Sequence, residues 1–198
     1  MSRHATARLF AAVDLPEEVR GQLASWARLA LRAAGGRPGA GHPLRVLDAD
    51  LLHVTLCFLG NRPVEEIEPI GAQLAGVVEG GCELSLGAPL WLPRRHPRVL
   101  AVELHDDNGE LARLQQRLLS ALHDICDFED DERAASAPPR RFHPHVTVAR
   151  MRAGAAPRER KLEPTPALRF SPSELVLYRS WLSPSGASYE ALASAPLS

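Results

Sequence analysis

Two stretches of the chain alternate apolar and polar side chains in the manner of half-buried β-strands. They cover residues 52–60 and 142–150. In each, the positions of one parity are largely apolar, while the other parity carries a His followed two residues later by a Thr. Because successive side chains of a strand point to opposite faces, the apolar positions are expected to join the core. The pattern predicts two strands of similar design, each with a His and a Thr facing away from the core.

Helical spacing of apolar residues marks three further segments. The first starts at Pro16, where two acidic residues suit the positive end of a helix, and stops at a Gly pair at 35–36. The second covers about 63–78, and Pro69 within it is expected to kink or delay the helix. The third has the clearest apolar stripe, formed by Leu111, Leu114, Leu118, Leu122 and Ile125.

Short β-favouring runs bounded by Gly, Pro and polar residues predict the remaining strands. These runs cover residues 8–13, 82–92, 99–104, 168–170, 174–182 and 189–193. Segments rich in polar residues, Gly or Pro at 35–43, 127–141 and 152–166 are expected to be loops. The order of elements indicates an α+β fold with an approximate internal duplication, in which each half carries one His-x-Thr strand.

Composition places few limits on function. With 198 residues, 45% of them hydrophobic and 24% charged, the chain suits one globular domain or two small lobes that share a core. No apolar run reaches the roughly 18 residues of a membrane span, and no signal peptide is evident. The three Cys have no CxxC spacing, which favours reduced thiols in the cytoplasm over disulfides or a zinc site.

The net charge of −1 excludes a global basic field for holding long nucleic acid, so RNA would have to be bound locally. Two local basic clusters stand out, at residues 94–98 and 140–141. The first is either a solvated hairpin tip or a clamp on the RNA backbone beyond the terminal nucleotide. The acidic run 127–132 could hold a divalent cation, but it lacks the ligand spacing of a calcium loop and is expected to be solvated.

The two strands repeat one motif, His53-Val54-Thr55 and His145-Val146-Thr147. The sequence has eight His and four Thr, so His-x-Thr triplets should be uncommon by chance. A third triplet, His4 to Thr6, lacks an apolar strand around it and is interpreted as chance. Two copies inside matching strands indicate one site built twice.

These paired motifs resemble those of the 2H phosphoesterases. The stretch Arg8 to Pro16 and the tail residues Leu177 to Ser180, with Gly186, Tyr189 and Glu190, are similar to the branch of RNA 2′,3′-cyclic phosphodiesterases, also described as 2′-5′ RNA ligase-like. The resemblance implies one bilobal domain over residues 1–198. Two pseudo-symmetric lobes of antiparallel sheet with flanking helices would enclose a groove that carries both motifs.

The resemblance also implies an activity, the metal-independent hydrolysis of RNA 2′,3′-cyclic phosphate ends to 2′-phosphomonoesters. His53 and His145 would act as acid and base, because imidazole titrates near neutral pH. The resemblance favours His53 as the acid on the leaving oxygen and His145 as the base on water. Thr55, Thr147 and Arg150 would bind the phosphate. No cofactor is expected, and a monomer is expected to act on such RNA ends or on small cyclic nucleotides.

Strand parity gives further expectations for single residues. Arg150 lies five positions from His145 and should face the other way, unless the strand end bends. Phe58 should be core, with nucleobase stacking as the alternative, and Cys57 should pack beside the groove rather than act as a nucleophile. His143 shares the parity of His145 and could line the groove.

Several other functions remain open. Within the same chemistry, the chain could ligate RNA through 2′-5′ bonds or hydrolyse a small cyclic nucleotide. A non-catalytic module that binds RNA ends is a second class. A zinc enzyme with His53, His143 and His145 as ligands is a third, but it leaves the two Thr unexplained.

Overall fold

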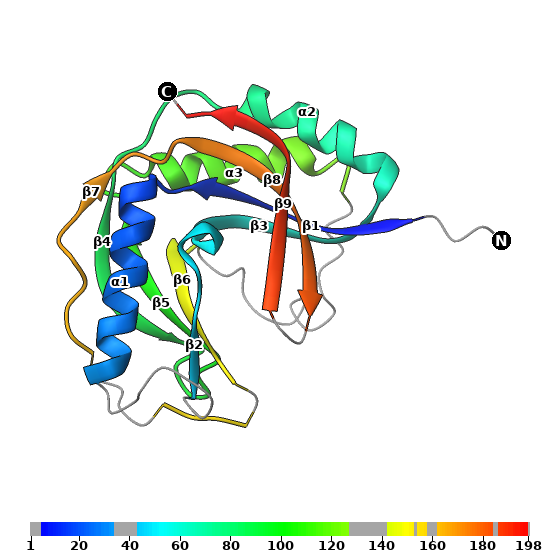
Figure 1. Cartoon of the computed structure of the whole chain (residues 1–198). Helices are drawn as coiled ribbons and strands as arrows, with labels where there is room; N and C mark the ends of the chain where they lie inside the picture. Colours follow the sequence, from blue (N-terminus) through cyan, green and yellow to red (C-terminus); the bar gives the residue numbers. More distant parts are fainter. Residues whose placement is uncertain are drawn as a thin grey trace.

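The computed structural model describes residues 5–33, 43–126, 142–152, 154–157, 162–183 and 186–197. In this part of the chain, nine strands form one antiparallel sheet flanked by helices (Figure 1). The strands are β1 (Thr6–Asp14), β2 (Leu44–Val46), β3 (His53–Pro63), β4 (Leu84–Leu92), β5 (Val99–His105), β6 (His145–Met151), β7 (Arg169–Phe170), β8 (Glu174–Ser183) and β9 (Gly186–Pro196). The helices are α1 (Glu17–Ala33), α2 (Ile67–Val77) and α3 (Glu110–Leu122), with short 3₁₀ turns η1 (Ala49–Leu51) and η2 (Val64–Glu66).

The two motif strands meet at the centre of this sheet. The strand order is β7-β4-β5-β6-β3-β1-β8-β9. Strand β2 pairs with residues 149–151 of β6, on the edge of β6 that does not pair with β5. One half of the sheet is therefore β7-β4-β5-β6 and the other is β3-β1-β8-β9. They join where Val54 of β3 lies opposite Val146 of β6. The predicted α+β class is confirmed, and each half carries one motif.

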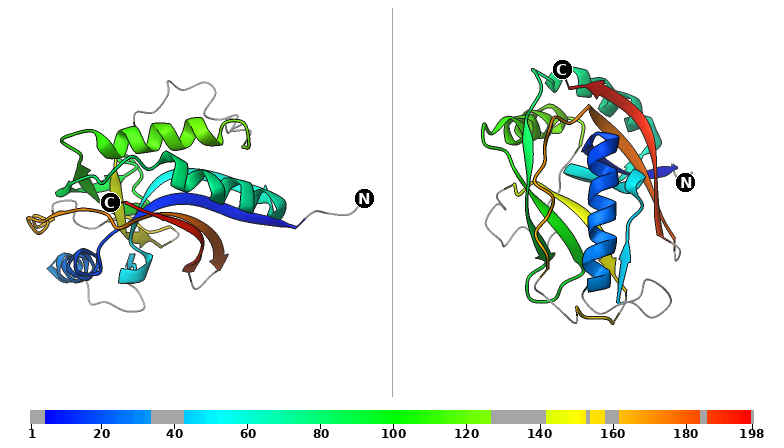
Figure 2. Two further views of the ribbon diagram at one scale, coloured as in Figure 1. Left: turned by 90° about the horizontal axis from the view of Figure 1, so that it is seen from above. Right: turned by 60° about the vertical axis from the view of Figure 1, so that its left-hand side comes forward.

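The helices cover the sheet from different sides. Helix α1 contacts β2 and β6, whereas α2 packs on β8 and β9, and α3 contacts α2 and β3. Figure 2 shows α1 on the opposite side of the molecule from α3. The apolar stripe of α3 is buried as predicted, and Ile125 follows the end of the helix. Within the described residues, no helix combines the length and the apolar character needed to span a membrane.

Most predicted elements are confirmed, with differences at their ends. The first motif strand continues to Pro63 instead of ending at Gly60. Helix α2 then begins at Ile67, after the turn η2, so Pro69 lies in the first helical turn. A proline there removes no hydrogen bond that the helix would otherwise make, which explains why the helix is delayed rather than kinked. The short strand β2 was not predicted.

Some sequence-based expectations lie outside the described residues. They concern most of the loop 35–43, the whole of 127–141 with its acidic run and Arg140–Arg141, and the triplet that starts at His4.

Candidate active site

The pairing of β3 with β6 brings the two motifs face to face. His53 and His145 are the first residues of their strands, and the valines that follow them are directly opposite each other. Because the strands are antiparallel, this register sets each His opposite the Thr of the other motif. Both valines are fully buried, so the four polar side chains share the other face of the sheet. The His-x-Thr motif that is repeated in the sequence therefore occurs twice, side by side, on one face of the sheet.

A groove of about 580 Å³ lies over this face. Its lining includes every site residue that the sequence suggested, namely His53, Thr55, His145, Thr147 and Arg150. Other residues of the lining come from β1, α3, β8 and β9, so both halves of the sheet contribute to the groove.

A β-bulge immediately after Thr55 overturns the parity expected for β3. On β1, the neighbours Ala12 and Ala11 pair with Thr55 and Cys57, which leaves Leu56 as the extra residue. A bulge shifts the side chains that follow it to the opposite face, up to the next irregularity of the strand. The prediction that Phe58 is core is therefore wrong. Its side chain is 69% exposed and lines the groove.

A β-bulge also occurs in β6. Ala101 and Leu100 of β5 pair with Thr147 and Ala149, so the extra residue is Val148, again the residue after the motif Thr. The expectation that Arg150 faces away from the groove is wrong for the same reason. Arg150 is exposed and lines the groove, as a bend in the strand would require.

Aromatic rings surround His53. The ring centroid of Phe10 lies 4.9 Å from that of the imidazole, and the ring of Tyr189 lies 5.3 Å away, edge-on. The imidazole also forms a hydrogen bond to the carbonyl of Leu51. The pKa of His53 is lowered to about 4, mainly by burial and to a smaller extent by the charges of Arg150 and His145, while the hydrogen bond to the Leu51 carbonyl opposes this shift. The ring is therefore neutral at pH 7.

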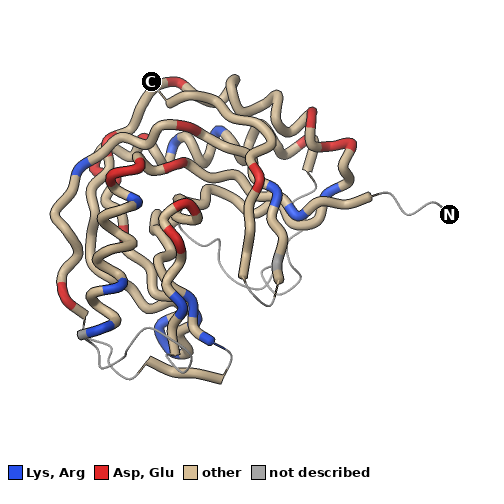
Figure 3. The backbone as a smooth tube through the Cα atoms, viewed as in Figure 1, with Lys and Arg blue, Asp and Glu red and all other residues tan. Residues whose placement is uncertain are grey.

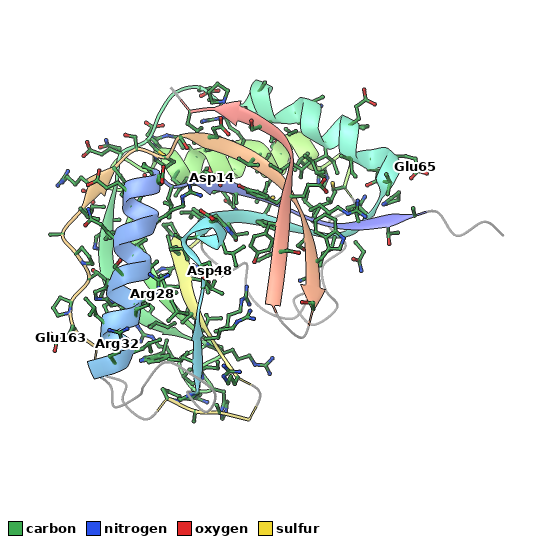
Figure 4. All side chains as sticks on the ribbon, in the orientation of Figure 1. Asp14, Arg28, Arg32, Asp48, Glu65 and Glu163 are labelled. Carbon is green, nitrogen blue, oxygen red and sulfur yellow. The ribbon has the colours of Figure 1, made fainter. Side chains whose placement is uncertain are left out.

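Further contacts hold the aromatic rings beside His53 in place. Tyr178 of β8 stacks on Phe10 with a centroid distance of 5.2 Å. Its hydroxyl lies 2.8 and 2.9 Å from the two carboxylate oxygens of Asp14, to which it donates. Asp14 ends β1, where Figure 4 labels it, and pairs in register with His53. Burial raises the pKa of Asp14, although the Tyr178 hydrogen bond opposes this rise.

The imidazole of His145 is oriented by a backbone carbonyl two residues earlier. Its Nδ1 lies 2.8 Å from the carbonyl oxygen of His143, so this nitrogen carries the proton and donates it. The other nitrogen, Nε2, is left for a substrate. His143 also lines the groove, and its Nε2 lies 3.4 Å from a carboxylate oxygen of Glu103. Both motif histidines thus bond to the carbonyl two residues earlier, which fixes each ring in a similar way.

Comparison with known proteins assigns this arrangement to a family. Residues 15–181 match the model of the 2′-5′ RNA ligase superfamily. The chain belongs to this superfamily. The resemblance drawn from the paired His-x-Thr motifs is confirmed.

Members of the superfamily with names and structures are similar over most of their length. An RNA 2′,3′-cyclic phosphodiesterase of Escherichia coli K12 is 33% identical over 144 residues, which cover 72% of this chain and 71% of the relative. One of Thermus thermophilus is 31% identical over 191 residues, 93% and 87% of the two chains. The crystal structure of E. coli LigT complexed with 3′-AMP gives a TM-score of 0.71 at 28% identity, with 98% and 99% of the chains covered.

The structure also tests the expectations for Cys57 and for a zinc site. Cys57 packs in the core beside the groove, and burial raises the pKa of its thiol to about 12. A thiol with this pKa stays protonated at neutral pH and is a poor nucleophile. Among the residues that the structure describes, no three His, Cys, Asp or Glu side chains are grouped as metal ligands. The zinc alternative with His53, His143 and His145 gains no support from this geometry.

Several groove residues carry no sequence signal for a role in catalysis or binding. Arg8 and Tyr189 belong to the stretches that are similar to the family, and both line the groove. Gln115 of α3 reaches it as well, and its amide donates to the carbonyl of the bulged Leu56. These residues come from β1, β9 and α3, outside the two motif strands, so their place in the groove could not be inferred from the periodicity of the motifs.

Proposed function

We propose that this chain hydrolyses the 2′,3′-cyclic phosphate ends of RNA to 2′-phosphomonoesters without a metal ion. The observation that carries the proposal is the register of β3 and β6, which sets each His opposite the Thr of the other motif on one groove face. The names of the similar E. coli and T. thermophilus proteins support the substrate class. The need for residues from both halves supports a single bilobal domain over residues 1–198. We expect the enzyme to act as a monomer in the reducing cytoplasm, with which three buried cysteines agree.

The groove supplies an acid, a base and phosphate ligands. One imidazole takes a proton from water, whose oxygen forms a bond to phosphorus, while the bond from phosphorus to the ribose O3′ breaks. The other imidazole gives its proton to O3′, so one water is consumed and a 2′-phosphomonoester remains. The hydroxyls of Thr55 and Thr147 donate to the phosphoryl oxygens, and the guanidinium of Arg150 neutralises their charge.

The environment of His53 bears on which ring acts first as the base. A neutral imidazole can accept a proton, whereas the acid must start protonated. Aromatic rings on two sides and the charge of Arg150 favour the neutral form of His53. We therefore propose His53 as the base on water and His145 as the acid on O3′, the reverse of the assignment that the family resemblance favours.

Turnover of an oligoribonucleotide with a 2′,3′-cyclic phosphate, measured in EDTA, tests the function. We expect turnover in EDTA and a product with its phosphate on the 2′ oxygen. Inactivity in EDTA that is reversed by added zinc would support the metal alternative. Binding without turnover would identify a module for RNA ends, and joining of the cyclic end to a 5′-hydroxyl RNA would favour ligation.

Phe58 offers a flat apolar surface to the base of the terminal nucleotide. Stacking of a base on an aromatic side chain contributes about 1–3 kcal/mol, so Phe58→Ala is expected to raise KM roughly tenfold and to leave kcat nearly unchanged. Because the ring is exposed, the variant should unfold at nearly the wild-type temperature. Kinetics on the cyclic oligoribonucleotide and a thermal melt measure both effects.

Phe10→Ala is the matched comparison for Phe58→Ala. Phe10 is 3% exposed and packs between His53 and Tyr178, so its loss should destabilise the fold by about 3–5 kcal/mol. An unchanged KM in the folded Phe58→Ala protein would show that this ring does not bind the base.

A further inference from the structure

A second hollow lies beside the hairpin that joins β4 to β5. It has a volume of about 600 Å³. Its lining includes Arg95, His96 and Arg98 of the hairpin and Arg152 just after β6. None of the described residues that line it is Asp or Glu. Three arginines around one hollow have the chemistry of an anion site, because one guanidinium group can donate two hydrogen bonds to the oxygens of a phosphate.

This hollow and the active groove are lined by neighbouring residues of β6 and of the segment that follows it. Arg150 lines the groove, and the next two residues, Met151 and Arg152, line the second hollow. Arg150 also lies directly opposite Arg45 of β2. The positive charge therefore extends from the groove to the hairpin.

The basic side chains form a local concentration of charge. Figure 3 shows Lys and Arg positions gathered where β6 ends and where β2 and β5 begin. The whole chain has a net charge of −1, so this end of the sheet differs from the average of the surface. A local positive field of this kind attracts a phosphate backbone without reading its sequence.

The backbone under the hollow is held by the sheet. The amide of Met151 donates to the carbonyl of Arg98 at 2.7 Å, and the amide of Arg152 donates to the carbonyl of Pro43 at 2.7 Å. The hairpin is thereby tied to the end of β6, and β6 in turn to the segment that leads into β2. The arginines project from a fixed frame, which lowers the entropy lost when they bind a ligand.

We propose that Arg95, Arg98 and Arg152 form a subsite for the RNA backbone on the 5′ side of the terminal nucleotide. Arg152 lies five residues beyond Thr147, roughly 16 Å along a strand at about 3.3 Å per residue. A nucleoside cyclic monophosphate in the groove cannot reach this far, whereas an oligoribonucleotide can. The inference rests on the proposed function, and it makes single-stranded RNA, rather than a free cyclic nucleotide, the preferred substrate.

The test compares two substrates with the same cyclic end, a nucleoside 2′,3′-cyclic monophosphate and an oligoribonucleotide. For the double variant R95A/R98A, kcat/KM on the oligoribonucleotide is expected to fall roughly tenfold at low salt, with no change on the monophosphate. The slope of log kcat/KM against log salt should become shallower by about 0.7 for each lost contact. R113A/R169A is the matched control, because it removes two exposed arginines from α3 and β7. Thermal melts check that both variants fold.

Binding of an oligoribonucleotide that ends in a 2′-phosphate, followed by fluorescence anisotropy, separates this inference from the proposed function. If wild type turns over neither substrate but R95A/R98A binds this RNA more weakly than the control, the function fails and the subsite stands. Equal losses on both substrates, or no loss on the oligoribonucleotide, would overturn the subsite. Competition by inorganic polyphosphate as strong as that by RNA would also overturn it, because the hollow would then be a general anion site.

Discussion

His53→Ala and His145→Ala are each expected to lower kcat on the cyclic oligoribonucleotide by about 10²–10⁴, the usual contribution of a general acid or base. Each histidine starts a motif strand and lines the groove, and a ring N–H of each is engaged by a backbone carbonyl. His105→Ala, at the end of β5 and outside the groove, is the matched control and should keep wild-type activity. Full activity in either motif variant would refute the two-histidine mechanism.

The pH profile of the wild type distinguishes the roles of the two histidines. The pKa of His53 is lowered to about 4 by burial, so the ring loses its proton as the pH rises through this value. If His53 is the base in the free enzyme, kcat/KM should rise with pH through about 4 and this limb should be absent in His53→Ala. A limb near 4 that falls as the pH rises would instead make His53 the acid, as the family resemblance favours.

Much of the fold followed from hydrophobic periodicity, because most strands and helices of this chain have one apolar face. The stripe of α3 and the valines of the two motifs are buried as their spacing required. Strand β2 could not be predicted, because three residues next to a Gly- and Pro-rich segment are too few to show an alternation of apolar and polar side chains. It forms because its backbone groups pair with the outer part of β6.

The face on which each site residue lies could be predicted up to the bulge in each strand, but not beyond it. His and Thr precede the bulge in each strand, so simple alternation placed them correctly. Phe58 and Arg150 follow it, and alternation placed both on the wrong face. An extra residue in a strand is defined by its partner, here β1 or β5, and nothing in the motif itself marks Leu56 or Val148 as unpaired.

The two bulges also show how a duplicated site acquires two functions. Phe58 and Arg150 each lie three residues after the motif Thr, and each is brought into the groove by the bulge between. One half of the sheet thus presents an aromatic ring at this position and the other half a guanidinium. A nucleotide needs both, since its base is flat and apolar and its phosphate is anionic. The His-x-Thr motif is repeated, while the position three residues after its Thr differs between the halves.

Thr55→Val and Thr147→Val are each expected to lower kcat by about 10²–10³, the cost of removing one donor to a developing oxyanion. Valine keeps the β-branched shape that suits a strand, so the folded structure should persist. Thr6→Val makes the same change on β1 at an exposed position outside the groove and should keep wild-type kinetics. Steady-state kinetics with the cyclic oligoribonucleotide give the three values.

The double variant T55V/T147V tests whether both hydroxyls serve the same phosphate. Groups that act on one transition state as a unit give losses that do not multiply, so the double variant should lose less than the product of the single losses. The opposed register of the motifs predicts this coupling, because each Thr lies across from the His of the other strand. Losses that multiply would mean that the two hydroxyls act independently. Single variants with unchanged kcat and raised KM would mean that they bind the ground state and contribute nothing specific to the transition state.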